Sequence, residues 1–154
     1  MNLDAIFGAI NLVAMAGWIA LLAGPLMPRL SQRIAALACP AILALVYVAL
    51  LVSGLASDPA PAAGGPSPGF TTLDGVAAIF TTRQAVLTGW AHYLAFDLLV
   101  GAWEAREARR RGIAHWKLVP CLGLTFVTGP LGFLVFLALR AAHRSNWREI
   151  DASR

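Results

Sequence analysis

Charged side chains are scarce in this chain of 154 residues, where they make up 13% of the sequence, against roughly a quarter in an ordinary soluble domain. Lysine occurs once, as Lys117, beside the end of an apolar segment. The chain therefore lacks a mid-span lysine for a retinal Schiff base. Hydrophobic residues reach 58%. This balance leaves no room for a separate soluble domain and predicts an all-α membrane protein.

Cofactor-binding patterns are also missing. The three histidines lie far apart in the sequence, so the His-rich boxes of membrane di-iron enzymes are absent, and no Glu-x-x-His pair occurs. Neither a phosphate-binding glycine loop nor a Gly-x-Ser-x-Gly elbow is present. Cys39 and Cys121 lie in apolar segments without a CxxC pattern; we interpret them as buried thiols, with a disulfide as the alternative. We predict no cofactor and no metal, which leaves acid–base chemistry or binding on a largely apolar ligand.

Long hydrophobic runs dominate what is present. The windows 5–28, 34–57 and 118–139 carry no formal charge, and a fourth, 84–103, is interrupted only by Asp97. Each can cross a hydrocarbon core of ~30 Å, which takes about 20 helical residues. We predict a single membrane domain over 1–154, a bundle of four transmembrane helices at about 4–27, 33–54, 84–106 and 117–140. The first residues lack the basic region that precedes a cleaved signal, so the first segment is expected to stay as a span.

Proline and glycine mark the breaks in this pattern. The stretch 56–70 is a proline- and glycine-rich linker with too little apolar bulk to order itself. After it, Thr71 or Thr72 can cap a short amphipathic helix over 72–81, which we place on the membrane surface. Pro40 predicts a kink in the second span, and Gly129–Pro130 predicts one in the fourth.

The formal charge of +4 lies mostly beside the helix ends. The basic runs 106–111 and 140–148 abut spans, so anionic lipid head groups, and not nucleic acid, are their expected counter-ions. The seven cations in the loops after spans one and three are Arg29, Arg33, Arg106, Arg109, Arg110, Arg111 and Lys117. The five on the other side are Arg83, Arg140, Arg144, Arg148 and Arg154. By the positive-inside rule, both termini are expected outside the cytoplasm. The compact, alanine- and arginine-rich chain without a plastid transit peptide is typical of a bacterial inner-membrane protein.

The third predicted span concentrates the polar chemistry. It contains His92, Asp97 and Glu104, and such groups are expensive to hold in hydrocarbon unless they are paired, hydrated or used. At about 100° per residue, Trp90, Asp97 and Glu104 recur on one stripe, with Tyr93 in the same sector. Asp97 and Tyr93 are then deep and Glu104 is shallower, while His92 projects a quarter-turn or more away. This stripe should line the interior of the bundle.

Each of these side chains also has a purely structural interpretation. The candidate partners of Asp97 across the bundle are Asn11, Tyr47, Thr125 and Thr128. Glu104 would pair with Arg106 or another arginine of the same loop at the interface, and His92 would donate to a carbonyl near the outer surface. Gly101, in the same sector as Asp97, leaves room for a neighbouring helix or a ligand.

Three segments carry a resemblance to a known family. They are Leu73-Asp-Gly-Val-Ala-Ala-Ile-Phe80, His92-Tyr-Leu-Ala-Phe-Asp-Leu-Leu-Val-Gly-Ala-Trp-Glu-Ala-Arg106, and Val119-Pro-Cys-Leu continuing through Thr125-Phe to Gly129-Pro-Leu-Gly132. Together they resemble the ABA4-like (abscisic-acid-deficient 4) membrane family, over nearly the whole chain outside the linker. The match to the plant members holds at Trp90, His92, Asp97 and Leu98 and departs around Glu104. Plant members act in forming neoxanthin from violaxanthin, so the resemblance implies a carotenoid-related role.

That resemblance implies a redox-neutral isomerisation, in which an epoxide end group becomes an allene with a tertiary alcohol. Such a step needs an acid for the epoxide oxygen, a base for a polyene proton, and no electron carrier. A carboxyl group desolvated in a helix bundle can act as a proton donor near neutral pH. The predicted catalytic residues are His92, Asp97 and Glu104, with Asp97 as the acid–base group and His92 as its partner in proton transfer. The predicted substrate-binding residues are Trp90, Tyr93, Gly101, Asn11 and Tyr47.

A non-catalytic carotenoid- or lipid-binding helper of other enzymes is the alternative function. In either case the expected partners are the lipid bilayer and an apolar, carotenoid-like ligand. A second copy of the chain, or enzymes of carotenoid metabolism, are further candidate partners.

Overall fold

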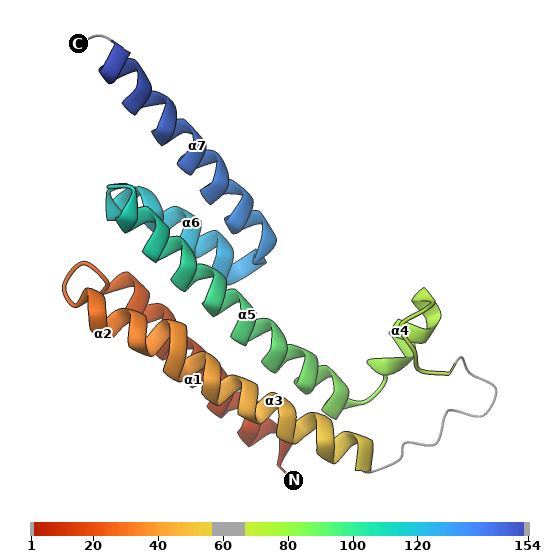
Figure 1. The fold of residues 1–154 in the computed structure, drawn as a ribbon. Helices are drawn as coiled ribbons and strands as arrows, with labels where there is room; N and C mark the ends of the chain where they lie inside the picture. Colours follow the sequence, from red (N-terminus) through yellow and green to blue (C-terminus); the bar gives the residue numbers. More distant parts are fainter. Residues whose placement is uncertain (1, 57–66, 153–154) are drawn as a thin grey trace.

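The computed structural model describes residues 2–56 and 67–152, with side chains up to His143. Over these residues the fold is helical and is built around α5 (Arg83–Arg110), the long central helix of Figure 1. The helices α1 (Leu3–Leu22) and α3 (Cys39–Ala56) pack along one side of α5, and α6 (His115–Thr128) and α7 (Pro130–Ala152) lie along the other. The central position of α5 means that its polar side chains face several different neighbours.

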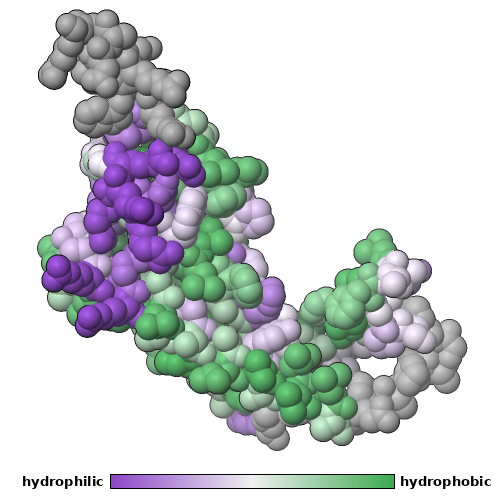
Figure 2. Space-filling view, viewed as in Figure 1, coloured by the Kyte–Doolittle hydropathy of each residue, from purple (hydrophilic) through white to green (hydrophobic). Residues whose placement is uncertain are grey.

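Three stretches of the described chain are long and apolar enough to cross a membrane. They are Leu3–Leu22, Pro28–Ala56 and Arg83–Arg110, close to the predicted spans 4–27, 33–54 and 84–106. Their lipid-compatible surface is visible in Figure 2, where hydrophobic residues cover the bundle away from the basic end. Leu12 and Leu45, for example, are both 72% exposed. These helices indicate a membrane protein.

The second of these stretches begins earlier than predicted and changes its winding. It consists of α2 (Pro28–Arg33), a π-helical turn η1 (Ile34–Ala38) and then α3. Pro28 fits the first helical position because its missing N–H is not needed there. Pro40 displaces the carbonyl four residues before it, and the turn upstream widens so that Cys39 N–H donates to Ile34 O. The kink predicted at Pro40 is thus a π-helical turn that precedes the proline.

The predicted fourth span, 117–140, is wrong as a single kinked helix. The chain stops α6 at Gly129, whose φ of +54° lies outside the helical region, and Pro130 begins α7. The helix α7 then folds back on α6, so closely that a Cβ on Gly132 would overlap the backbone nitrogen of Thr125. Residues 115–143 therefore form a helical hairpin, which we call the α6–α7 hairpin.

This reversal also changes where the chain ends lie. The start of α1 lies beside the start of α5, because Asp4 pairs with Arg83 at 2.6 Å. The described part of α7 returns to the other end of α5, where Arg140 and His143 contact Glu107 and Arg111. Residues 3 and 143 thus lie at opposite ends of α5 (Figure 1), an arrangement that differs from the expected four-span bundle. The side of the membrane on which each terminus lies stays a prediction.

The short helix predicted over 72–81 is α4 (Leu73–Ile79), which begins where Thr72 Oγ1 accepts a hydrogen bond from Gly75 N–H (3.0 Å). It stands off the bundle beside the start of α5 (Figure 1), and the Phe80 ring lies against Gly89. Its place on a membrane surface stays a prediction. Most of the predicted linker 56–70 lies outside the described residues.

Candidate functional site

The polar side chains of α5 are divided among three neighbouring surfaces. The helix starts at Thr82, whose hydroxyl accepts from Ala85 N–H (3.1 Å), and runs without a break for 28 residues. Asp97 faces the turn of the α6–α7 hairpin, and His92 faces α3. Glu104 faces the buried side of α6. The stripe expected to hold Asp97 and Glu104 together is therefore divided between two environments, and His92, expected a quarter-turn away, has a third.

Asp97 is half-buried against the tip of the hairpin. Its Oδ1 lies 2.7 Å from the position that a Cβ would take on Gly129. Its Oδ2 is buried and has no hydrogen-bond partner among the described residues. Tyr93, one turn earlier on α5, is near enough to interact with this carboxyl and donates its hydroxyl to the carbonyl of Val127 (3.1 Å). We call Tyr93, Asp97, Val127 and Gly129 the Asp97 site.

An aromatic row continues from the Asp97 site towards the start of α1. Trp90 stacks on Tyr93, with ring centroids 5.3 Å apart, and lies 6.2 Å from the Phe7 ring. The Trp90 indole N–H donates to Asn11 Oδ1 (3.1 Å), and the Asn11 amide donates to Phe7 O (2.8 Å). Trp90 and Phe7 are 38% and 48% exposed. The structure thus brings Asn11, Trp90 and Tyr93, three predicted substrate-binding residues, into one outward-facing row that reaches Asp97 through Tyr93.

His92 lies on a different face of α5. Its exposed ring stacks on Phe96 with centroids 4.5 Å apart and lies 5.6 Å from the ring of Tyr47 on α3. Tyr47 is consequently a neighbour of His92, and not of Asp97 as one structural interpretation expected. The described contacts include none between His92 and Asp97, which agrees with the angular separation read from the sequence.

Glu104 is fully buried, with 0% of its surface exposed. Thr125 Oγ1 lies 3.0 Å and 3.2 Å from its two carboxyl oxygens, so the hydroxyl donates to this group. The expectation of a shallow Glu104 paired with Arg106 was wrong, because Arg106 instead donates to Gln32 Oε1 (3.0 Å). Thr125, which was a candidate partner of Asp97, is hydrogen-bonded to Glu104 instead. The connection between α5 and α6 is only four residues long, which keeps the two helices side by side, and Thr125 lies on the face of α6 that meets Glu104.

Gly101 serves the close approach of α1 to α5. A Cβ there would lie 2.7 Å from two ring atoms of Trp18 and 3.2 Å from Leu21 Cδ1. The space that the sequence offered to a helix or a ligand is therefore filled by the Trp18 indole, and Gly101 is a packing position in this structure.

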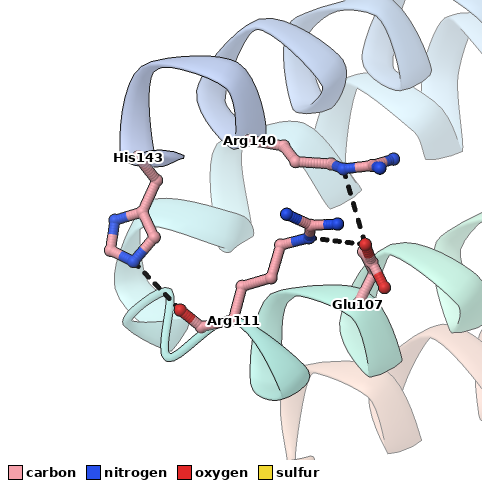
Figure 3. Close-up of polar contacts among 4 residues, drawn as sticks. All are labelled: Glu107, Arg111, Arg140 and His143. Carbon is pink, nitrogen blue, oxygen red and sulfur yellow. Dashed lines mark hydrogen bonds and ion pairs between the residues drawn. The ribbon is translucent and has the colours of Figure 1, made fainter. Parts of the chain in front are cut away.

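A fourth polar group, absent from the predicted site, holds the middle of α7 to the end of α5 (Figure 3). Glu107 Oε1 accepts from Arg111 Nε and lies 3.4 Å from Arg140 Nε, while His143 Nε2 donates to the backbone carbonyl of Arg111 (3.0 Å). The i,i+4 spacing of Glu107 and Arg111 could have revealed the first pair from sequence. Arg140 could not have been assigned, because its place depends on the hairpin.

The described part of the chain contains neither a disulfide nor a group of side chains that could hold a metal ion. Cys39 and Cys121 are both free and buried, as the interpretation of buried thiols expected. Within residues 2–56 and 67–143, no three His, Cys, Asp or Glu side chains gather as metal ligands do.

These features define a helical membrane protein with carboxyl groups on its central helix. The chain belongs to the ABA4-like family: the family model described as ABA DEFICIENT 4-like matches residues 5–136. That range includes the Asp97 site, the aromatic row and the Glu104–Thr125 pair, and it ends before Arg140. Comparison with curated proteins and with solved structures gave no match.

Proposed function

We propose that this protein acts in carotenoid metabolism as a membrane isomerase, converting an epoxide end group of a carotenoid into an allene with a tertiary alcohol. Family membership supports a role related to abscisic acid and carotenoid (neoxanthin) metabolism. The observation that carries the chemical part is the buried Asp97 Oδ2, which has no partner among the described residues. A buried polar atom normally has a hydrogen-bond partner, and a substrate oxygen would supply one here.

Asp97 acts as both acid and base in this proposal. Its protonated carboxyl gives a proton to the epoxide oxygen, the bond from carbon to that oxygen opens, and a tertiary alcohol forms. The polyene carries the resulting positive charge until the carboxylate takes a proton from it, which creates the allene and restores the acid. No electrons are gained or lost. Tyr93 orients the carboxyl from one turn away, and general acid–base catalysis of this kind contributes about 100- to 10,000-fold.

The aromatic row of Phe7, Trp90 and Tyr93 supplies the binding surface. These rings are stacked or tilted against one another and open outward beside Asp97. A carotenoid is long and apolar, so it can approach from the bilayer and place its end ring against aromatic faces. His92 and Tyr47 form a second aromatic pair on the α3 side, so in this proposal any proton that passes between His92 and Asp97 does so without a direct contact between the two side chains.

The membrane arrangement belongs to the same proposal. The three apolar stretches cross the bilayer of a bacterial inner membrane, and the α6–α7 hairpin enters from the basic end of α5 and returns to it. The helix α6 has 14 residues, about 21 Å at 1.5 Å per residue, which is shorter than a ~30 Å hydrocarbon core. The hairpin tip at Gly129 then lies at the depth of Asp97, and α4 rests on the opposite surface.

A non-catalytic carotenoid-binding helper is the second candidate. The outward-facing position of the aromatic row favours it, because a surface open to lipid can bind a polyene, a second copy of the chain or a carotenoid enzyme without chemistry. Both functions use the aromatic row, but only the isomerase requires a proton-exchanging group at position 97.

Pigment extraction from cells that make an epoxycarotenoid, with and without this chain, separates the two. A new carotenoid structure on chromatography supports the isomerase, whereas a change in amount alone supports the helper. Asp97→Asn should remove the new product in the first case and leave pigment amounts unchanged in the second. His92→Ala tests the second aromatic pair, and product formation at the wild-type level would exclude His92 from proton transfer.

A further inference from the structure

A cavity lies at the basic end of the bundle, away from the Asp97 site. Its volume is about 180 Å³, and it lies between the end of α1, the last turns of α5 and the first turn of α6. Leu21, Ala108 and Leu118 provide apolar walls, while Arg109 and His115 bring nitrogen donors to it. We call this space the basic-end cavity.

A buried hydroxyl lies next to Gly24, one of the residues that line this cavity. Ser31 is 4% exposed, and its buried hydroxyl has no hydrogen-bond partner among the described residues. This hydroxyl lies 3.5 Å from the position of a Cβ on Gly24, and the His115 ring carbon Cε1 lies 3.8 Å from that same position. His115 Nε2 donates to the carbonyl of Leu22 (3.1 Å), which fixes the ring beside the cavity. A buried hydroxyl without a partner is costly unless something binds it.

The charge around the cavity is positive. Arg109 lines it, and Lys117 is exposed close by in the sequence. The nearby carboxylate Glu107 is already engaged by two arginines. Figure 2 shows the hydrophilic patch that results at this end of the molecule, directly beside the hydrophobic surface of the bundle. The first turn of α6 adds the partial positive charge of a helix N-terminus.

We propose that the basic-end cavity binds the phosphate group of an anionic phospholipid. Arg109 and the Ser31 hydroxyl would donate to the phosphate oxygens, and the apolar walls would hold the start of the glycerol and acyl portions. A lipid source fits better than free phosphate, because most of the lining is apolar and Trp116 beside it is 72% exposed, as at a membrane interface. This site is separate from the carotenoid chemistry proposed for Asp97.

The test uses the purified full-length chain in detergent and measures binding of fluorescent phosphatidylglycerol, with phosphatidylcholine as the zwitterionic reference. We expect tighter binding of phosphatidylglycerol, weakened by added salt. Arg109→Gln should reduce its affinity by roughly fivefold or more, since one basic side chain contributes about that much to anionic lipid binding. The matched control Arg110→Gln removes the same charge one residue away from the cavity and should change affinity by less than about twofold.

Ser31→Ala separates a bound ligand from a merely buried hydroxyl. If the hydroxyl donates to the lipid phosphate, the variant loses affinity while the thermal unfolding midpoint of the lipid-free protein is unchanged or raised. Unchanged affinity in Ser31→Ala, or equal losses in Arg109→Gln and Arg110→Gln, would overturn the site. Full displacement of phosphatidylglycerol by inorganic phosphate would overturn the lipid assignment.

Discussion

Asp97 and Glu104 lie two helical turns apart on α5, yet their surroundings differ in every respect that matters for proton chemistry. Glu104 is fully buried, and the Thr125 hydroxyl reaches both of its oxygens. Asp97 is half-buried at the hairpin tip, and its Oδ2 has no partner among the described residues. A carboxyl that is enclosed and bonded stabilises packing, whereas one with an unpartnered oxygen beside an outward-facing aromatic row has bonding capacity left for a substrate.

The packing around Glu104 depends on the close approach of α6 and α7. We expect the largest loss of stability from a substitution that prevents this approach. A Cβ on Gly132 would overlap the backbone of Thr125, and backbone cannot move aside as a flexible side chain can. Gly132→Ala should therefore lower the free energy of unfolding by about 3 kcal/mol or more, as measured by denaturation in detergent. Gly123→Ala on α6 is the control, because nothing lies within 4 Å of its Cβ position; it should be neutral or stabilising. Equal losses in the two variants would contradict the contact.

The Asp97 side of the comparison is tested at the hairpin tip. Gly129 and Gly112 both have positive φ, +54° and +67°, but only Gly129 has the Asp97 carboxyl at its Cβ position. Each change to Ala should cost about 1–2 kcal/mol from backbone strain, and Gly129→Ala should cost about 1 kcal/mol more. Gly129→Ala should also reduce product formation, and Gly112→Ala should not. A loss of product in both variants at matched stability would contradict the claim that the contact between Gly129 and Asp97 is needed for product formation.

Thr125→Val sharpens the comparison from the Glu104 side. It keeps the shape of the side chain and removes the only hydroxyl that contacts this carboxyl among the described residues. We expect a loss of about 1–3 kcal/mol in the free energy of unfolding, because a buried polar group is left without its donor. In Thr128→Val the lost hydroxyl bonded only Leu124 O of its own helix, so the loss should be below about 1 kcal/mol. A larger loss of unfolding free energy in Thr128→Val than in Thr125→Val would contradict the assignment of Thr125 as the partner of Glu104.

The smallest effect is expected at a third carboxyl, which is exposed. Asp4 and Arg83 form an ion pair at 2.6 Å with side chains 77% and 75% exposed. Asp4→Asn should change the free energy of unfolding by less than about 1 kcal/mol and leave product formation unchanged. This variant therefore serves as the baseline for the free energy of unfolding and for product formation. A loss of stability larger than that of Thr125→Val would contradict the view that burial, and not charge, makes a carboxyl important for stability.

The sequence predicted the elements whose boundaries depend on local chemistry. The long apolar windows predicted α1, the α2–α3 stretch and α5, and Thr72 predicted the start of α4, because length, hydropathy and capping are properties of neighbouring residues. The hairpin also had a local signal: a glycine that ends one helix followed by a proline that begins the next. We interpreted Gly129–Pro130 as a kink because the run around it was long enough to span.

The candidate site was less predictable because it depends on the register of α6 against α5. Seven-residue spacing placed Asp97 and Glu104 on one stripe, but a helix has several neighbours, and the spacing does not say which neighbour each residue meets. Once the short connection after α5 and the reversal at Gly129 are fixed, Glu104 meets Thr125 and Asp97 meets the hairpin tip. Gly101 was ambiguous for the same reason, since the Trp18 indole that fills its space comes from α1.

The difference between the unpartnered Asp97 carboxyl and the hydrogen-bonded Glu104 carboxyl is tested most directly by two isosteric changes with two measurements each. Asp97→Asn and Glu104→Gln keep side-chain size and remove the exchangeable proton, and each variant is assayed for carotenoid product and for its unfolding midpoint in detergent. We expect Asp97→Asn to lose product by at least about 100-fold with an unchanged midpoint, and Glu104→Gln to lower the midpoint while most of the product remains. Full product from Asp97→Asn, or parallel losses of product and stability in both variants, would contradict the account.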